Sequence, residues 1–313
     1  MIFLAPLQGY TEYFFRNAYA RHFGGIDLAI APFVSLVKGK KVSLNHIRDL
    51  WPENNRPMKI IPQVMGREPE LFITMAKALE DLGYDSMNWN LGCPIRQIAR
   101  KKRGSGLLPW PEEIEQILSE VIPRINISFS VKTRIGYESP DEAGPLMEVY
   151  NRYPLEYLVI HPRLGTQMYE GEVHLEVFGK CLARSKNPVV YSGDICDEDI
   201  YRDLRLRFPG LKHWMLGRGL FSDLFLPEKI TGVFDEKNMN ERFWAFQYDL
   251  LEAIQERMRR EVNVLNKTKE LWTKWAGMFG EKDKILAMIY PVKSLSEMRK
   301  VLGEVEHNFC LKP

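Results

Sequence analysis

The sequence places a cysteine in a short segment whose residues suit proton transfer. Cys93 lies in Asn90-Leu91-Gly92-Cys93-Pro94, directly after a β-rich run, and Pro94 restricts the backbone that follows the thiol. No adjacent residue supplies an obvious general base, so the pattern favours a proton donor over a protease-like nucleophile. The structural alternative is that Cys93 is a small buried hydrophobic residue.

Further polar residues stand at or just after the ends of other β-rich runs. They are Gln63, Asn90, Lys132, His161 with Arg163, Ser192-Gly193-Asp194 and Gly217-Arg218-Gly219. A single histidine or a Gly-Arg-Gly segment is commonly structural, but several such residues at one rim favour a site. Glycines let backbone N–H groups approach a phosphate closely, and Arg218 supplies positive charge. We therefore predict a phosphorylated cofactor or substrate.

A basic run follows the cysteine segment. Between positions 96 and 103 the chain carries Arg96, Arg100, Lys101, Lys102 and Arg103. Such a run is either a solvated surface or a set of contacts to the phosphates of a nucleic acid. Composition alone leaves both interpretations open, and the net charge of +2 neither requires nor excludes a nucleic-acid partner.

The elements that must position these residues alternate between β-rich and amphipathic helical segments. Helices are predicted over 11–23, 69–82, 111–121, 141–153 and 197–208, where apolar residues recur at three- and four-residue spacing. Eight β-rich runs precede, separate or follow them, at 2–5, 28–31, 59–64, 86–90, 129–133, 157–160, 188–191 and 213–216. This alternation predicts a (β/α)8 TIM barrel, whose active site lies at the carboxyl ends of the strands.

The rhythm changes after residue 220. Residues 221–240 are expected to form a linker, and Phe243, Phe246, Leu250, Ile254, Met258 and Val262 form one helical stripe. Leu271, Trp272, Trp275 and Phe279 indicate a second helix, and Ser294 with Glu297 forms a capping-box pattern that opens a last one. We predict a catalytic barrel over residues 1–235 and a helical bundle over 236–313.

Composition excludes several classes of protein. With 313 residues, 45% of them hydrophobic, the chain is neither disordered nor low in complexity. Its four cysteines form no CxxC pair, so neither a metal site nor a disulfide framework is expected. No apolar stretch approaches the roughly 20 residues of a membrane span, and the N-terminus does not read as a signal peptide. We expect a cytoplasmic protein.

Ordered motifs extend along both predicted domains. They are Ala5-Pro6-Leu7-Gln8-Gly9-Tyr10-Thr11 with Phe15-Arg16, Asn90-Leu91-Gly92-Cys93-Pro94, Gly104-Ser105-Gly106-Leu107-Leu108, Val131-Lys132-Thr133-Arg134-Ile135-Gly136, His161-Pro162-Arg163 with Gln167, Tyr169 and Gly171, Gly193-Asp194-Ile195, and Gly217-Arg218-Gly219. In type, order and spacing these motifs resemble those of the flavin-dependent tRNA-dihydrouridine synthases.

This resemblance implies a barrel with a C-terminal helical domain, an FMN cofactor and NADPH as its reductant. The residues expected to bind the cofactor are Pro6, Leu7, Gln8, Gln63, Lys132, His161, Ser192, Gly193, Asp194, Gly217 and Arg218. Among them, the glycines, Asp194 and Arg218 would contact the flavin phosphate. Lys132 would face the N1–O2 edge of the flavin, where negative charge accumulates on reduction.

The resemblance also implies the reaction and its substrate. A hydride passes from flavin N5 to C6 of a uracil, Cys93 protonates C5, and Asn90 helps to hold the base. A thiol near neutral pH is mostly protonated and can serve as this acid. The uridine must be turned out of a folded tRNA. The expected RNA contacts are Arg96, Arg100, Lys101, Lys102, Arg103 and Arg163, and a monomer is the simplest expectation.

Several positions depart from the family's usual residues, including Arg96 in place of a frequent Lys and Lys101-Lys102 in place of glycines. Asn88 stands where the family often has Asp, Leu164 where it often has Thr, and Ser192 where it often has Asn. The alternatives are a synthase acting on ribosomal RNA, a dihydroorotate dehydrogenase-like enzyme acting on a free pyrimidine, and an RNA-binding protein or chaperone that has lost catalysis. The motifs do not indicate which uridine is modified.

Overall fold

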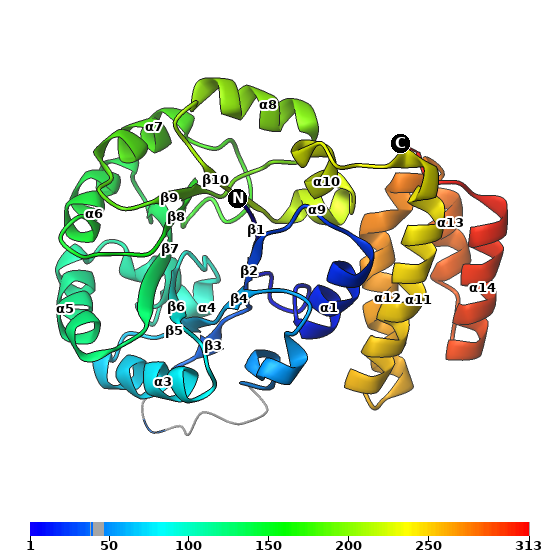
Figure 1. Cartoon of the computed structure of the whole chain (residues 1–313), viewed down its shortest axis with the longest axis horizontal. Coiled ribbons are helices and arrows are strands. Elements are labelled where there is room, and N and C mark those ends of the chain that lie inside the picture. Colours follow the sequence, from blue (N-terminus) through cyan, green and yellow to red (C-terminus); the bar gives the residue numbers. More distant parts are fainter. Residues whose placement is uncertain (38, 40–46, 313) are drawn as a thin grey trace.

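A computed structural model describes residues 1–37, 39 and 47–312 of the chain. Within these residues, ten parallel strands form one sheet, with helices around its outside (Figure 1). The strands are β1 (Ile2–Leu4), β2 (Leu28–Ile30), β3 (Val34–Ser35), β4 (Ile60–Ile61), β5 (Gln63–Met65), β6 (Ser86–Leu91), β7 (Ser128–Gly136), β8 (Leu158–Leu164), β9 (Val189–Tyr191) and β10 (His213–Leu216).

The sheet closes on itself. Its order is β3-β5-β6-β7-β8-β9-β10-β1-β2-β4, and β4 is separated from β5 only by Pro62. The third predicted strand is therefore one segment split in two, because proline has no N–H to donate to the ladder. Its first part pairs with β2 and its second part with β6. The predicted barrel is confirmed.

Helices follow most strands and cover the barrel. They are α1 (Tyr13–His22), α3 (Pro69–Asp81), α4 (Arg96–Ala99), α5 (Pro111–Val121), α6 (Ala143–Tyr150), α7 (Leu175–Arg184), α8 (Glu198–Arg207), α9 (Arg218–Ser222) and α10 (Leu226–Thr231). The predicted helix over 141–153 is shorter, because a 3-10 turn at Pro140–Glu142 precedes it and is closed by a capping box from Ser139.

The C-terminal part is helical, as the apolar stripes predict. It comprises α11 (Met239–Arg257), α12 (Glu261–Trp275), α13 (Lys282–Ile289) and α14 (Leu295–Asn308). Ser294 caps α14 by accepting a hydrogen bond from the backbone N–H of Glu297. Three positions of the predicted stripes lie outside their helices. α11 ends at Arg257, before Met258 and Val262, and Val262 is 56% exposed on α12. α12 ends at Trp275, and Phe279 lies in the 3-10 turn that follows it.

The predicted linker over 221–240 is also not a linker. It contains the last two residues of α9, all of α10, a 3-10 turn at Glu236–Asn238 and the start of α11. The side chains of Phe221, Leu224 and Phe225 are buried. Short helices packed on the barrel were missed because each is too short to display a period of 3.6 residues.

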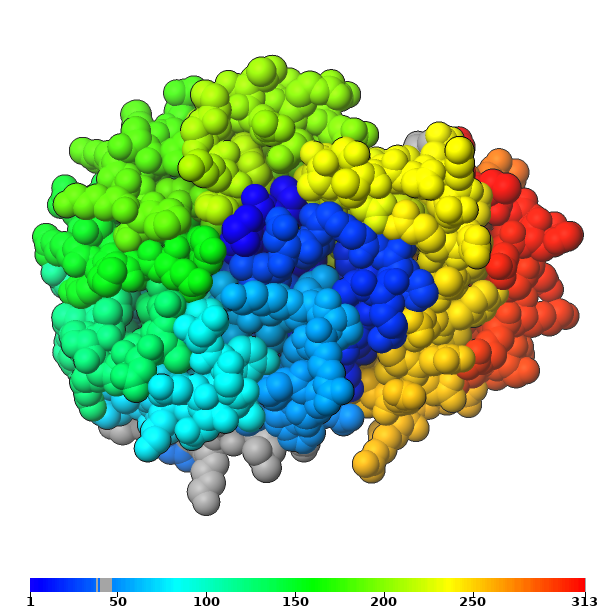
Figure 2. Space-filling view, viewed as in Figure 1, coloured from blue at the N-terminus to red at the C-terminus, as the bar shows by residue number. Residues whose placement is uncertain are grey.

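Aromatic side chains join the barrel to the C-terminal helices. Phe246 of α11 packs edge-on against Phe15 and Phe23 of the α1 region, with ring centroids 5.9 and 5.1 Å apart. Figure 2 shows the N-terminal segment (blue) lying directly against the segment that follows residue 220 (yellow). Among the described helices, none is both long and apolar enough to cross a membrane.

Candidate active site

One cavity of about 590 Å³ lies where the carboxyl ends of the strands meet. Except for Gln63, every predicted catalytic or cofactor-binding residue lines it, together with Tyr10, Phe33, Ile95, Arg134, Tyr169 and Lys274 among others. Arg134 and Lys274 were not predicted as site residues. Arg134 had a signal, because it stands two residues after Lys132 on one strand and therefore faces the same way. Lys274 had none, because it comes from the helical region.

The Cys93 loop is held in place by hydrogen bonds that Asn90 and Ser105 make to its backbone groups. Asn90 Oδ1 accepts hydrogen bonds from the N–H groups of Gly92 at 3.1 Å and Cys93 at 2.9 Å. The carbonyl of Cys93 accepts from the N–H and the hydroxyl of Ser105, both at 3.0 Å. Gly104 is required there, because a Cβ on it would lie 2.6 Å from that carbonyl oxygen. The thiol is thus fixed at the cavity wall.

Burial raises the pKa of the Cys93 thiol. The backbone N–H of Ile95 and the charges of Arg134 and Lys132 act in the opposite direction but do not cancel the effect of burial. The thiol is therefore protonated at neutral pH, although two cations lie near it. A protonated thiol suits a proton donor, whereas a nucleophile requires the thiolate.

A chain of buried amides orients Asn90. Its Nδ2 donates to Gln63 Oε1 at 2.9 Å, Gln63 Nε2 donates to Asn88 Oδ1 at 2.8 Å, and Asn88 Nδ2 donates to Ser130 Oγ at 2.8 Å. Gln63 is fully buried and acts through Asn90 rather than as a cavity wall. An aspartate at position 88 could not donate a hydrogen bond to Ser130. The asparagine that this chain has in place of the family's frequent aspartate therefore extends the chain of hydrogen bonds to β7.

Lys132 and Arg134 carry two neighbouring cations on β7. Burial first, and the charge of Arg134 second, lower the pKa of Lys132 to about 8. Arg134 donates to the backbone oxygens of Gly92, Leu164 and Met168, so its guanidinium ties the loop after β6 to the end of β8 and the turn that follows β8. Two buried cations this close are stabilised by an anion between them.

A second cationic group lies at the ends of β8 to β10. Arg163 and Arg218 both donate to the carboxylate of Asp194. Burial raises the pKa of Asp194, but hydrogen bonds and charges from the two arginines outweigh it and leave the pKa below its usual range. The Asp194 backbone is in the left-handed region at φ +36°, which turns the chain sharply after Gly193.

His161 is neutral in this surrounding. Burial, followed by the charges of Arg134 and Lys132, moves its pKa well below the usual value. Arg163 lies 3.2 Å from His161 Nε2, and because a guanidinium can only donate, Nε2 must accept. The remaining ring proton is then on Nδ1, where it is available as a hydrogen-bond donor.

Arg163 does not occupy the surface position that an RNA contact requires. Its side chain is 3% exposed, and its guanidinium is used by Asp194, His161 and the carbonyl oxygen of Gly171. The prediction that Arg163 contacts RNA therefore does not fit the structure. The alternation along β8 places Arg163 on the same side as His161, which directs it inward.

The basic run forms α4 and the turn that follows it. Arg96, Arg100 and Lys101 are exposed, whereas Arg103 is half-buried. Lys102 is paired with Glu113 at 2.7 Å and lies 3.6 Å from the centre of the Trp110 ring. Ile95, directly before α4, lines the cavity, so this basic surface begins at the cavity wall.

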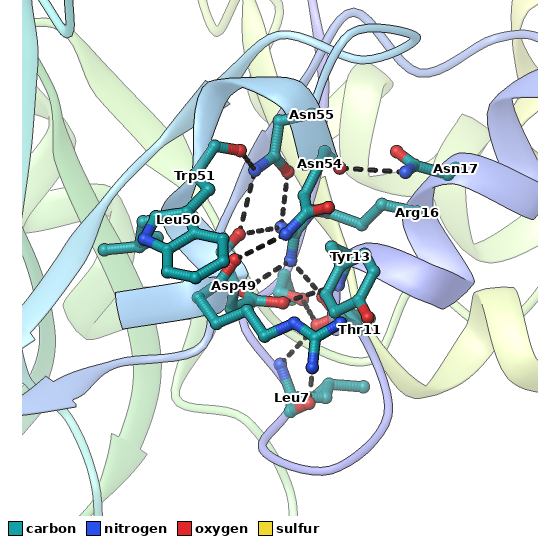
Figure 3. A network of polar contacts seen from close by, with 12 residues as sticks. Leu7, Thr11, Tyr13, Arg16, Asn17, Asp49, Leu50, Trp51, Asn54 and Asn55 are labelled. Atoms are coloured by element: carbon teal, nitrogen blue, oxygen red, sulfur yellow. Dashed lines mark hydrogen bonds and ion pairs between the residues drawn. The ribbon is translucent and has the colours of Figure 1, made fainter. Parts of the chain in front are cut away.

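The 7–11 turn, which follows the first strand, completes the cavity. Thr11 Oγ accepts from the N–H of Leu7 at 2.8 Å, and Arg16 donates to the carbonyl oxygen of Thr11 at 2.6 Å. Arg16 is fully buried, and it also contacts Asp49 and Asn55 (Figure 3). The ends of the turn that carries Leu7 and Gln8 are thus held by contacts with the barrel part of the chain.

A family model confirms the resemblance in the motifs. The model described as dihydrouridine synthase (Dus) matches residues 3–288, which covers the barrel and most of the C-terminal helices. The chain belongs to the dihydrouridine synthase family.

Similar proteins of this family come from several bacteria. A tRNA-dihydrouridine(16) synthase of Pseudomonas putida is 29% identical over 269 residues, 83% of this chain and 81% of the relative. A probable tRNA-dihydrouridine synthase of Staphylococcus epidermidis is 31% identical over 234 residues, 72% of this chain and 70% of the relative. A tRNA-dihydrouridine synthase B of Vibrio cholerae is 26% identical over 218 residues, 69% of this chain and 66% of the relative.

Solved structures share the fold at low sequence identity. The old yellow enzyme homologue of Zymomonas mobilis has a TM-score of 0.52 and 11% identity, covering 77% of this chain and 91% of that one. The histamine dehydrogenase of Rhizobium sp. 4-9 has a TM-score of 0.55 and 10% identity, covering 80% and 48%. At this identity the likeness concerns the barrel alone.

Proposed function

We propose that this member of the family is a tRNA-dihydrouridine synthase, which reduces the C5–C6 double bond of a uridine in tRNA with FMN as cofactor and NADPH as reductant. The observation that carries the proposal is that Cys93, whose pKa is raised by burial, lines the same cavity as the cations that an anionic cofactor requires. The names of the bacterial relatives support tRNA as the substrate.

The cavity fits FMN in charge and shape. Positive charges from Lys132, Arg134 and Arg218 face a cavity whose lining includes one carboxylate, that of Asp194. A Cβ on Gly193 would lie 3.1 Å from the Tyr191 hydroxyl oxygen and 3.2 Å from Pro162 Cδ, so the backbone there is kept free of a side chain. Gly193, Gly217 and Arg218 would hold the phosphate, and Pro6, Leu7, Gln8 and Lys132 the ring system.

FMN, when bound and reduced by NADPH, supplies a hydride to C6 of the uracil. The Cys93 thiol then donates its proton to C5, which completes the reduction. Asn90 is held rigidly by Gln63 and the backbone of the Cys93 loop, and it positions the base beside the thiol. Lys132 and the N–H at His161 Nδ1 stabilise negative charge at the ring system, since both line the cavity.

The exposed basic residues of α4 and of the turn after it suit contacts with the tRNA backbone. Arg96 directly follows the cavity-lining Ile95, and Arg100 and Lys101 come after α4, where phosphates flanking an extruded uridine would pass. Lys102 and Arg103 contribute less, because the first is paired with Glu113 and the second is half-buried. A tRNA substrate places the activity in the cytoplasm.

The first test is a site-resolved map of dihydrouridine in transfer and ribosomal RNA from cells with and without this chain. We expect dihydrouridine to be lost at one defined tRNA position. This position would identify the uridine that the enzyme modifies, which the names of the relatives do not settle because one specifies position 16 and another gives no position. Loss in ribosomal RNA would change the substrate. The comparison is repeated in cells that lack the related synthases. If removing this chain from those cells changes neither RNA, a free pyrimidine becomes the substrate to assay with the purified, FMN-loaded protein.

A further inference from the structure

The C-terminal helices contact the 7–11 turn directly. Lys267 of α12 donates through Nζ to the carbonyl oxygen of Gly9 at 3.0 Å and lies 4.9 Å from the centre of the Tyr10 ring. Only 12% of the Lys267 side chain is exposed. Gly9 is in the left-handed region at φ +81°, a conformation that glycine adopts without strain. The ammonium therefore fixes the backbone at the sharpest point of this turn.

Glu270, one helical turn further along α12, completes the contact. Its carboxylate pairs with Lys267, which neutralises the half-buried ammonium. Burial, followed by the neighbouring Glu270 carboxylate, raises the pKa of Tyr10 to about 12, so the Tyr10 hydroxyl stays protonated at neutral pH. Tyr10 also packs edge-on against Phe221, with ring centroids 5.3 Å apart.

The same turn forms part of the cavity wall. Leu7, Gln8 and Tyr10 line the cavity, and Pro6 directly before them does too. From the barrel side, Arg16 holds the carbonyl of Thr11. From the other side, the contacts are those of Lys267 and Glu270. The turn is thus held at its two ends, Leu7 and Thr11, from the barrel side and at its middle, Gly9 and Tyr10, from α12.

We propose that Lys267 is a positioning residue for the cofactor site: by holding Gly9 and, with Glu270, Tyr10, it keeps Pro6, Leu7 and Gln8 in the shape that binds the flavin. The inference rests on the proposed function for the identity of the ligand. It assigns α12 a part in completing the cofactor site, in addition to any contact that the C-terminal helices make with RNA.

Other contacts also dock the helices on the barrel. Asp249 of α11 accepts from Arg21 at 2.7 Å and lies 2.9 Å from His22 Nε2. Arg242 pairs with the buried Glu228 and donates to the carbonyl oxygen of His22. Since these pairs lie outside the cavity lining, loss of Lys267 should disturb the turn while the helices stay docked.

The test compares Lys267→Met with Lys269→Met in the full chain. Lys269 is on the same helix and also donates to backbone oxygens, those of Tyr290 and Val292, but these belong to the C-terminal helices. Lys267→Met should raise the FMN dissociation constant about tenfold, as expected for loss of a charged hydrogen bond. Hydrogen exchange at the N–H groups of Leu7 and Tyr10 should accelerate. Lys269→Met should change neither, and Lys267→Arg should restore binding.

The outcomes separate the two proposals. If the unaltered chain does not bind FMN, the proposed function is wrong. If it binds FMN and Lys267→Met binds equally well with unchanged exchange at the turn, the positioning role is wrong. If Lys267→Met does not fold, Lys267→Ala is measured instead, because it removes the hydrogen bond to Gly9 without placing a long apolar side chain there. A normal dissociation constant and normal exchange in that variant would equally overturn the inference.

Discussion

The surroundings of Cys93 determine the protonation state of its thiol. The thiol stays protonated because burial outweighs the charges of Lys132 and Arg134. Removing it in Cys93→Ala should leave FMN and tRNA binding intact but slow dihydrouridine formation about 100-fold or more, the contribution of a positioned general acid. Single-turnover assays with nucleoside mass spectrometry measure this rate. Cys310→Ala, which removes an exposed thiol, is the control, and a Cys93→Ala rate equal to it would exclude the assignment.

Lys132 makes cofactor affinity depend on pH. Its pKa is about 8, lower than usual because burial disfavours the ammonium. Reduced flavin carries negative charge at the ring edge that Lys132 would face, so binding of reduced FMN is strongest where Lys132 is charged and weakens as pH rises through 8 and above. We expect the dissociation constant of reduced FMN to increase between pH 7.5 and 9.5. The Lys132→Met variant should bind weakly at every pH and lack this slope, and an identical slope in both proteins would assign the effect to another group.

At the scale of residues, the sequence predicts which residues belong to the site better than it predicts where their side chains point. Cys93, Asn90, Lys132 and Arg218 could be predicted because their positions follow strand ends and match motifs, and they line the cavity. Arg163 and Gln63 end in buried hydrogen bonds, since a motif does not show which neighbour satisfies a guanidinium or an amide. Lys274 could not be predicted, because it reaches the cavity only through the packing of α12 on the barrel.

Arg16 connects three elements through one buried guanidinium. It belongs to α1 and contacts Thr11 of the turn and both Asp49 and Asn55 (Figure 3). Arg16→Met leaves Asp49 without its cation and several polar groups unpaired, which should lower the free energy of unfolding by about 3 kcal/mol. Urea denaturation measures the change. Arg21→Met on the same helix removes a half-exposed pair and should cost less than about 1 kcal/mol. An equal decrease in the free energy of unfolding in both variants would show that the buried Arg16 network contributes no more stability than an exposed ion pair.

The exposed basic residues in and after α4 predict how tRNA binding depends on salt. Reversing two exposed charges in the variant Arg100→Glu with Lys101→Glu should weaken tRNA binding and reduce the slope of log affinity against log salt by about 2. Filter binding at several salt concentrations measures the slope. Lys180→Glu with Lys186→Glu reverses two exposed charges elsewhere on the barrel and should change the slope much less. If the two double variants agree, the run after Cys93 is only a solvated surface.

At the scale of elements, periodicity locates long segments and misses short ones. The helix Pro111–Val121 is predicted to the residue, because its apolar positions recur regularly and Pro111 marks its start. The split of the third strand depends on Pro62, whose effect on pairing appears only when both neighbouring strands are known. β7 and β8 extend to Gly136 and Leu164 because parallel partners continue to supply hydrogen bonds beyond the apolar core.

The whole molecule depends on a shared aromatic core between the predicted domains. Phe246 of α11 contacts Phe15, Tyr19 and Phe23 of the barrel side and Trp275 of α12. All of these rings are buried, so residues 1–235 alone would expose a large apolar surface. The boundary near residue 235 stays a prediction about chain organisation, and we do not expect the two parts to be stable separately.

Phe246→Ala tests this dependence. The cavity it leaves should lower the free energy of unfolding by about 3 to 5 kcal/mol, whereas Leu206→Ala, at a side chain that is 76% exposed, should cost far less. Because the core is shared, the barrel and the helices should unfold together in both variants. Near-ultraviolet and far-ultraviolet circular dichroism should therefore give one coincident transition. Two separated transitions in Phe246→Ala would mean that the C-terminal helices dissociate from a barrel that remains folded, and would make the two predicted domains independent units.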